Sequence, residues 1–268
     1  MPRKLSDSLM SKLLTGEYKE ILNFVKNDSE LSFQIRTSSV AMIYYKKSRV
    51  LSLYSRRIPN LISPRYCKEK NPIPLLDIKR PNTYFSDCKK CVDDFVKAKN
   101  NIEFSIQQKI ATDNSSLNNP YLVVDMEYQF EQNKIVHRIK KKTRFDLVAI
   151  EHSKNKIVLL EIKQGFASSL GKAGVNDHIN RFQEHFIHPE FGNSLRFDIV
   201  NIIKQKIELG LLSKEISSVI SYILDAEIEI GIAFAFNNNV EKDRYTERYG
   251  SEREILFVDI AKPEFILK

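Results

Sequence analysis

The hydrophobic pattern that predicts most about this chain lies in its middle. Two apolar stretches, 145–150 and 157–163, flank the turn-prone segment 152–155, a pattern that predicts a β-hairpin. Both faces of these strands are apolar, which favours a central position in a sheet covered by helices over a solvated edge. Three charged residues interrupt the pattern: Asp146, Glu161 and Lys163.

The length of the turn decides whether these charges meet. Alternation along a strand places Glu161 and Lys163 on one face and Ile162 on the other. An even number of turn residues sets Asp146 opposite Glu161 or Lys163, on that same face. An odd number sets it against an apolar neighbour, so that no cluster forms. On a plain edge hairpin all three would be ordinary surface charges.

The first third of the chain has a different pattern. Short amphipathic helices are expected within 5–27, followed by a small antiparallel β unit over 31–54. Five of the nine prolines fall within 57–82, which predicts a linker or a wrapped surface segment there. We therefore expect an N-terminal domain over 1–82 and a second domain over 83–268.

The second domain reads as an α/β fold with a mixed sheet of about five strands flanked by helices. In strand 121–130, Asp125 and Glu127 share one face, while the other face is uniformly apolar and expected to be the buried one. The segment 237–253 alternates Arg and Tyr and is interpreted as an exposed loop or, alternatively, as a phosphate-and-base contact. Besides the hairpin, the expected elements are helices over 86–111, 175–186, 195–212 and 213–224 and strands over 121–130, 227–236 and 254–260.

The charged residues of the hairpin resemble the signature of the PD-(D/E)xK phosphodiesterase superfamily, which has the restriction-endonuclease-like fold. In that family an aspartate on one strand precedes an acidic-x-Lys triplet on the next. Here the aspartate is Asp146 and the triplet is Glu161-Ile162-Lys163, while Phe145 stands where the family name has proline.

The resemblance implies a metal-dependent nuclease. Asp146 and Glu161, with the backbone carbonyl of Ile162, would bind Mg²⁺, for which Mn²⁺ could substitute, because hard oxygen ligands suit this ion. Lys163 would position the attacking water or offset charge on phosphorus. A helix before the sheet often adds a carboxylate in this family, and Glu103 matches that role by position.

Two alternatives remain for the supporting carboxylate. Glu127 reaches the same patch if its face is also the one that bears Asp146, and Glu103 is otherwise an ordinary solvated glutamate. Only one of the two needs to contribute.

The formal net charge of +8 favours a polyanionic partner. We expect this partner to be nucleic acid, with DNA ahead of RNA. A basic run precedes the hairpin, and a predicted helix carries further cations, although both features also occur on ordinary solvated surfaces. The candidate nucleic-acid-binding residues are Lys140, Lys141, Lys142, Arg144, His178 and Arg181.

Cysteines and hydropathy bear on the compartment. Cys67, Cys88 and Cys91 are too few for a disulfide framework, and the Cys88-x-x-Cys91 pair is a zinc half-site without visible further ligands. No apolar run approaches the ~20 residues that cross a bilayer, and the first residues lack a signal-peptide pattern. A cytoplasmic protein without membrane contact is expected.

The sequence thus predicts an Mg²⁺-dependent endonuclease acting on DNA, with RNA as the second substrate. A nuclease fold that binds nucleic acid or protein without turnover is the alternative. A phosphodiesterase acting on a small nucleotide is a third reading, which would lack salt-sensitive affinity for polymers. The sequence leaves open whether two copies form a homodimer.

Overall fold

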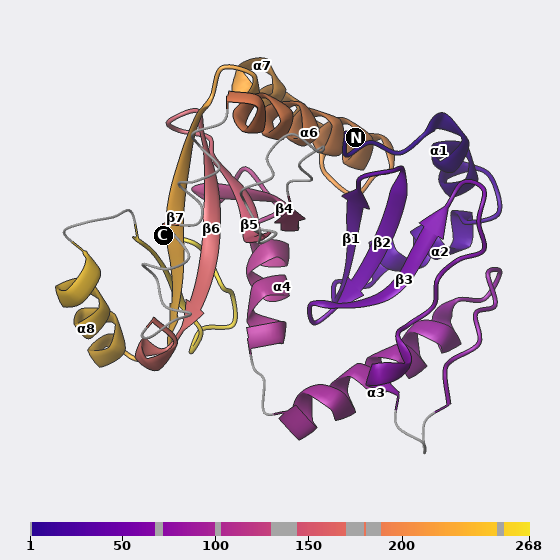
Figure 1. The fold of residues 1–268 in the computed structure, drawn as a ribbon, viewed down its shortest axis with the longest axis horizontal. Helices are drawn as coiled ribbons and strands as arrows, with labels where there is room; N and C mark the ends of the chain where they lie inside the picture. The colour runs from indigo at the N-terminus through magenta and orange to yellow at the C-terminus, as the bar shows by residue number, and fades with distance from the viewer. Residues whose placement is uncertain are drawn as a thin grey trace. The chain divides into compact units, whose positions relative to one another are not determined.

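The computed structural model describes residues 2–67, 72–99, 103–129, 144–169, 180, 189–250 and 255–268 of the 268-residue chain. The chain forms two compact units, each with its own β-sheet (Figure 1). The first unit consists of Met1–Gln108 and Asn201–Lys214. The second consists of Lys109–Val200 and Glu215–Lys268.

The first unit begins with two short helices and continues with a three-stranded antiparallel sheet of order β1-β2-β3. The predictions of helices within 5–27 and of an antiparallel β unit over 31–54 are confirmed. The elements are α1 (Asp7–Leu14), α2 (Lys19–Asn27), β1 (Leu31–Arg36), β2 (Val40–Tyr45) and β3 (Ser48–Tyr54).

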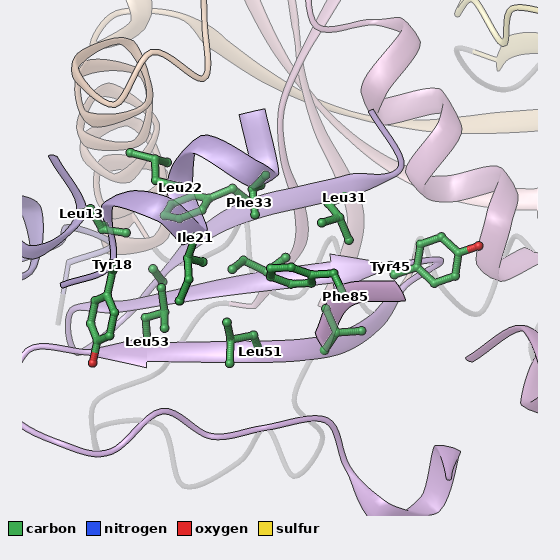
Figure 2. Packing of buried hydrophobic residues seen from close by; sticks show 14 of the residues in the cluster. Leu13, Tyr18, Ile21, Leu22, Leu31, Phe33, Tyr45, Leu51, Leu53 and Phe85 are labelled. Atoms are coloured by element: carbon green, nitrogen blue, oxygen red, sulfur yellow. The ribbon is translucent and has the colours of Figure 1, made fainter. Parts of the chain in front are cut away.

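An apolar core holds α2 against this sheet. Ile21, Leu22 and Val25 are the buried residues of α2, and their spacing gives the helix a single apolar face. Figure 2 shows Ile21 and Leu22 packed among side chains of the strands, including Phe33 and Leu51. The sheet therefore buries one face through contacts made entirely within the first unit.

Helix α3 (Asn82–Lys99) also belongs to the first unit. The Tyr84 hydroxyl donates to the Val50 carbonyl oxygen at 2.5 Å and accepts from the Ile62 N–H at 3.1 Å. The predicted boundary between residues 82 and 83 does not coincide with the division into units, because these bonds and the surrounding core hold α3 on the N-terminal sheet. The proline-rich segment before α3 contains the short 3-10 helix η1 (Pro64–Tyr66).

The three cysteines are free thiols of the first unit. Cys88 and Cys91 are buried on α3, and burial raises the pKa of each thiol to about 12. Both therefore stay protonated at neutral pH and pack as small apolar groups.

The second unit contains a five-stranded mixed sheet of order β4-β5-β6-β7-β8. The first two pairings are antiparallel and the last two are parallel. The prediction of a mixed α/β sheet of about five strands is confirmed. The strands are β4 (Tyr121–Gln129), β5 (Arg144–Glu151), β6 (Lys156–Gln164), β7 (Glu227–Phe236) and β8 (Ile255–Asp259).

Helices pack on both faces of this sheet. On one face, Phe145 of β5 lies 6.0 Å from Phe191 of α6 (Pro189–Glu208), measured between ring centroids. On the other face, Phe234 of β7 stacks on Tyr245 of α8 (Asn239–Tyr249) at 3.8 Å. We refer to these two surfaces as the α6 face and the α8 face.

Helix α8 corrects the prediction of a loop over 237–253. Asn238 caps the helix by accepting from the Glu241 N–H at 3.0 Å, and Tyr245 and Tyr249 are buried against the sheet. The two tyrosines therefore form part of the core, so the alternative prediction that they contact bases is wrong.

The remaining helices differ in detail from the predictions. The predicted helix over 86–111 corresponds to α3 and α4 (Glu103–Asp113), with 100–102 outside the described residues. The predicted helix over 213–224 is 3-10 in its first half, as η4 (Lys214–Val219), and then continues as α7 (Ile220–Ile223). The predicted helix over 175–186 lies outside the described residues, apart from residue 180.

The strand predicted over 121–130 is β4, but only in part as expected. Residues 121–128 are all buried, so both faces of β4 are covered rather than the apolar one alone. Within the described ranges, none of the helices is both long and apolar enough to span a bilayer.

Candidate functional site

The β5–β6 hairpin determines where Asp146 and Glu161 lie. Its turn holds the four residues 152–155, and the paired ladder runs from there to Leu147 opposite Leu160. One step further along this register, Asp146 is opposite Glu161, and their side chains share a face. The turn is thus the even-numbered alternative of the two that the sequence allowed.

Lys163 joins these two carboxylates. Its Nζ donates to Glu161 Oε1 at 3.0 Å. Asp146 Oδ2 accepts the backbone N–H of Ile162, also at 3.0 Å. Asp146, Glu161 and Lys163 are each at most 7% exposed, so the group lies inside the protein rather than on a solvated edge.

The bond from Ile162 also orients its carbonyl group. The N–H and C=O of one residue in a strand point to the same side of that strand. Since the N–H of Ile162 points to Asp146, its carbonyl oxygen is directed toward β5 as well. The predicted backbone ligand thus lies on the side of β6 where the aspartate is.

Glu127 occupies the next position in the same row. β4 pairs with β5 at the residues on both sides of Glu127, which places Glu127 opposite Asp146. Glu127, Asp146 and Glu161 therefore form a line across β4, β5 and β6, which we call the carboxylate row. Glu127 has a left-handed backbone conformation, with φ of 55°.

Arg144 neutralises the outer end of the carboxylate row. Its Nη1 lies 2.6 Å from Glu127 Oε2, with the Arg144 side chain 56% exposed and the Glu127 side chain 8% exposed. Arg144, predicted to bind nucleic acid, is thus also the ion-pair partner of a buried carboxylate.

A register shift in β4 brings a further carboxylate to this face. Val123 pairs with Ala149, whereas Asp125 pairs with Val148, so one extra residue is accommodated between them. Asp125 consequently shares the face of the carboxylate row, while Val123 points to the α6 face. Asp125 is buried. Strict alternation would have placed Val123 and Asp125 together, and the sequence contains no readable signal for the shift.

The other predicted site residues lie wholly or in part outside the described part of the structure. Glu103 is the first residue of α4, and its side chain is outside the described part of the structure. The candidate nucleic-acid-binding residues other than Arg144 also fall outside it: Lys140, Lys141, Lys142, His178 and Arg181.

The donor set suits a hard divalent cation in its chemistry. Asp146, Glu161 and the Ile162 carbonyl supply oxygen atoms only, and Mg²⁺ prefers one or two carboxylates completed by water. Asp146, Glu161 and Lys163 together carry a formal charge of −1 in a buried place, which favours a cation. Across the residues that the structure describes, no three His, Cys, Asp or Glu side chains gather as a metal-binding group, so a cation here would have Asp146 and Glu161 as its carboxylate ligands.

No protein-family model, curated protein or solved structure matches this chain. A function for this chain is therefore inferred from the geometry of the carboxylate row and from the motif that the row contains.

Proposed function

We propose that this chain is a metal-dependent nuclease of the PD-(D/E)xK type, with a restriction-endonuclease-like fold in its second unit. The observation that carries the proposal is the register of the β5–β6 hairpin. It sets Asp146 opposite Glu161 with Lys163 on the same buried face. Burying two carboxylates and an ammonium costs free energy even when they are paired, and titratable groups so placed are candidates for a functional site.

Each residue has a defined part in phosphodiester hydrolysis. Asp146 and Glu161 hold the cation through carboxylate oxygens, and the Ile162 carbonyl adds a neutral oxygen. The Mg²⁺ ion supplies Lewis-acid polarisation of the phosphate and activation of water. The Lys163 ammonium orients the attacking water or stabilises the charge that develops on the phosphate oxygens as the new P–O bond forms and the leaving oxygen departs.

The charge of the whole chain supports nucleic acid as the substrate. A formal net charge of +8 attracts phosphate polymers, because each neutralised phosphate releases counterions. We propose DNA as the main substrate and RNA as the second.

Cleavage assays with conservative variants test the proposal. Plasmid, single-stranded DNA and RNA are incubated with Mg²⁺ or Mn²⁺, using wild type, Glu161→Gln and Lys163→Met. We expect each variant to lose roughly 100-fold or more in cleavage rate while still binding the substrate, because each change removes a group that acts on the transition state. Asp225→Asn, an exposed carboxylate at the start of β7, is the matched control for charge.

One feature of the site favours a second candidate function. Glu161 is already paired with Lys163, and Asp146 already accepts a backbone bond, so both carboxylates have partners within the protein. This arrangement also suits a nuclease fold that binds nucleic acid without turnover. Binding with no cleavage under either metal would support this module and reject the nuclease.

A further inference from the structure

One flank of helix α8 lies beside the strand end that carries the E-x-K triplet. Tyr245 stacks on Phe234, and Phe234 is the β7 partner of Lys163 in the parallel register. Paired residues of neighbouring strands share a face, so α8 covers the face that bears Glu161 and Lys163. The helix and the proposed site are therefore neighbours on one surface of the same unit.

Contacts on the two sides of α8 fix its orientation. On one side, the Arg248 guanidinium carbon lies 5.9 Å from the ring centroid of Phe166, two residues after the end of β6. Glu241, on that same side, would lie 3.7 Å from a Cβ placed on Gly165. On the other side, Lys242 Nζ lies 4.9 Å from the ring centroid of Phe257 in β8. The flank with Arg248 thus faces the end of β6, and the flank with Lys242 faces away from it.

Arg244 extends the same flank by one turn. Residues four apart on a helix are neighbours, about 5–6 Å between Cβ atoms, so Arg244 and Arg248 form a short basic stripe. Both are exposed, and neither has an ion-pair partner within the described part of the chain. Asp243 and Glu247 lie on the opposite, outward side of the helix at 100° per residue.

The Arg248 guanidinium is also held in place. It lies over two rings, at 5.9 Å from Phe166 and 5.6 Å from Tyr249. A guanidinium held beside aromatic rings keeps N–H groups that can donate to an anion. A pre-positioned arginine fork is well suited to a phosphate group.

We propose that the stripe of Arg244 and Arg248 binds the phosphate backbone of the nucleic-acid strand that enters the site of Asp146, Glu161 and Lys163. This inference rests on the proposed function for the identity of the ligand. It assigns two positioning residues that contact the strand beside the scissile bond. Nucleic acid is favoured over another polyanion because the stripe lies beside the strand end that carries Lys163.

A binding experiment tests the stripe directly. Fluorescence anisotropy of a labelled single-stranded DNA oligonucleotide is measured in EDTA over a series of salt concentrations. Wild type is compared with Arg244→Gln, Arg248→Gln and the double variant. Lys154→Gln is the matched control, because it removes the same charge in the β5–β6 turn, at the opposite end of the hairpin from Lys163.

The slope of log affinity against log salt is the decisive measurement. Each lost phosphate contact should reduce the magnitude of this slope by about 0.7 for a single strand. Arg248→Lys should keep most of the slope but weaken binding, because it retains the charge without the fork. The assignment would be overturned if the arginine variants had the same slope and affinity as Lys154→Gln. It would also be overturned if the wild type bound polyglutamate and DNA with equal affinity.

Kinetics separate this inference from the proposed nuclease activity. In a cleaving enzyme, Arg248→Gln should raise KM with kcat retained, whereas Lys163→Met should lower kcat with binding retained. Cleavage with unchanged KM in the arginine variants would reject the role of the stripe but not the nuclease activity. DNA binding that depends on the two arginines, without any cleavage, would reject the nuclease activity but support the stripe. A wild type that neither binds nor cleaves DNA would reject both proposals.

Discussion

Replacing Asp146 by asparagine separates its role as a proposed metal ligand from its role in the sheet. Asparagine keeps the size of the side chain and an oxygen that accepts the Ile162 N–H, a bond of 3.0 Å in the wild type. The change removes one of the two carboxylates that the register of the hairpin sets on one face. Cation binding would then depend on Glu161 alone.

The expected effect is a lost thermal response to metal. A ligand that binds only the folded state at 100 times its dissociation constant stabilises it by about 2.7 kcal/mol. For a domain of roughly 150–250 residues, each kcal/mol raises Tm by about 2–4 °C, so saturating Mg²⁺ should raise the wild-type Tm by about 5–11 °C. Asp146→Asn should show no such rise. Asp146→Ala should also lose about 1–3 kcal/mol without metal, because it leaves the buried Ile162 N–H unpaired.

Calorimetry on EDTA-treated protein, with and without added Mg²⁺ or Mn²⁺, measures both effects. Asp225→Asn serves as the control, since it removes an exposed carboxylate at the other end of the sheet and should respond as the wild type does. An equal rise in Tm for wild type and Asp146→Asn would refute the assignment of Asp146 as a metal ligand, whatever the cleavage assays show.

Four further predictions concern the framework of the two units. Tyr128→Phe removes the 2.9 Å bond from the buried hydroxyl to Asp198 and should lower the free energy of unfolding by about 1–3 kcal/mol in urea titrations, with an unchanged slope. Cys88 should resist iodoacetamide in the native protein at pH 8 and react after unfolding, as followed by mass spectrometry, because burial raises its pKa to about 12 and the thiolate is the reactive form. The pKa of this thiol is about 9 in the unfolded chain and about 12 in the folded protein. Its contribution to the free energy of unfolding should therefore be present below pH 9 and decline toward pH 12. Cys88→Ala should show a smaller decline over this pH range. Tyr245→Ala should cost about 3–5 kcal/mol by removing a fully buried ring from its stack on Phe234, with a loss measurable as a lower urea midpoint.

The centre of the second unit was predictable because short-range rules decide it. The alternation of the hairpin and its four-residue turn together determine which side chains of β5 and β6 share a face. The parallel strands β7 and β8 were also readable, since continuous apolar runs are typical of strands covered on both sides. These features depend on neighbours in sequence, so the pattern of residues contains them.

Helix α8 was missed although its sequence contained a signal. Asn238 and Glu241 have the spacing of a helix N-terminus, with the Asn238 side chain accepting the Glu241 N–H and Glu241 Oε2 accepting the Asn237 N–H at 2.9 Å. Tyr245 and Tyr249 are four residues apart, which matches a helix better than a loop. The abundance of charges in the segment concealed an apolar contact made by only two side chains.

The division into units was less readable, because it depends on contacts between distant parts of the chain. Gln205 of α6 accepts the Leu5 N–H at 2.7 Å and donates to the Leu5 carbonyl at 2.8 Å, two buried bonds that join segments 200 residues apart. Composition marked the proline-rich stretch as a boundary, but no local pattern indicates that a later helix returns to the first unit.

The backbone of Glu127 connects the strain in β4 with the proposed chemistry. A left-handed conformation costs a residue with a side chain about 1–2 kcal/mol, and β4 adopts it at the position opposite Asp146. The ion pair with the exposed Arg144 offsets little of this cost, because solvent screens such pairs. A glycine at this position would relieve the strain and remove a buried carboxylate. Strained residues that persist in folded proteins cluster at functional sites, so the conformation of Glu127 supports the proposal of a site at the carboxylate row.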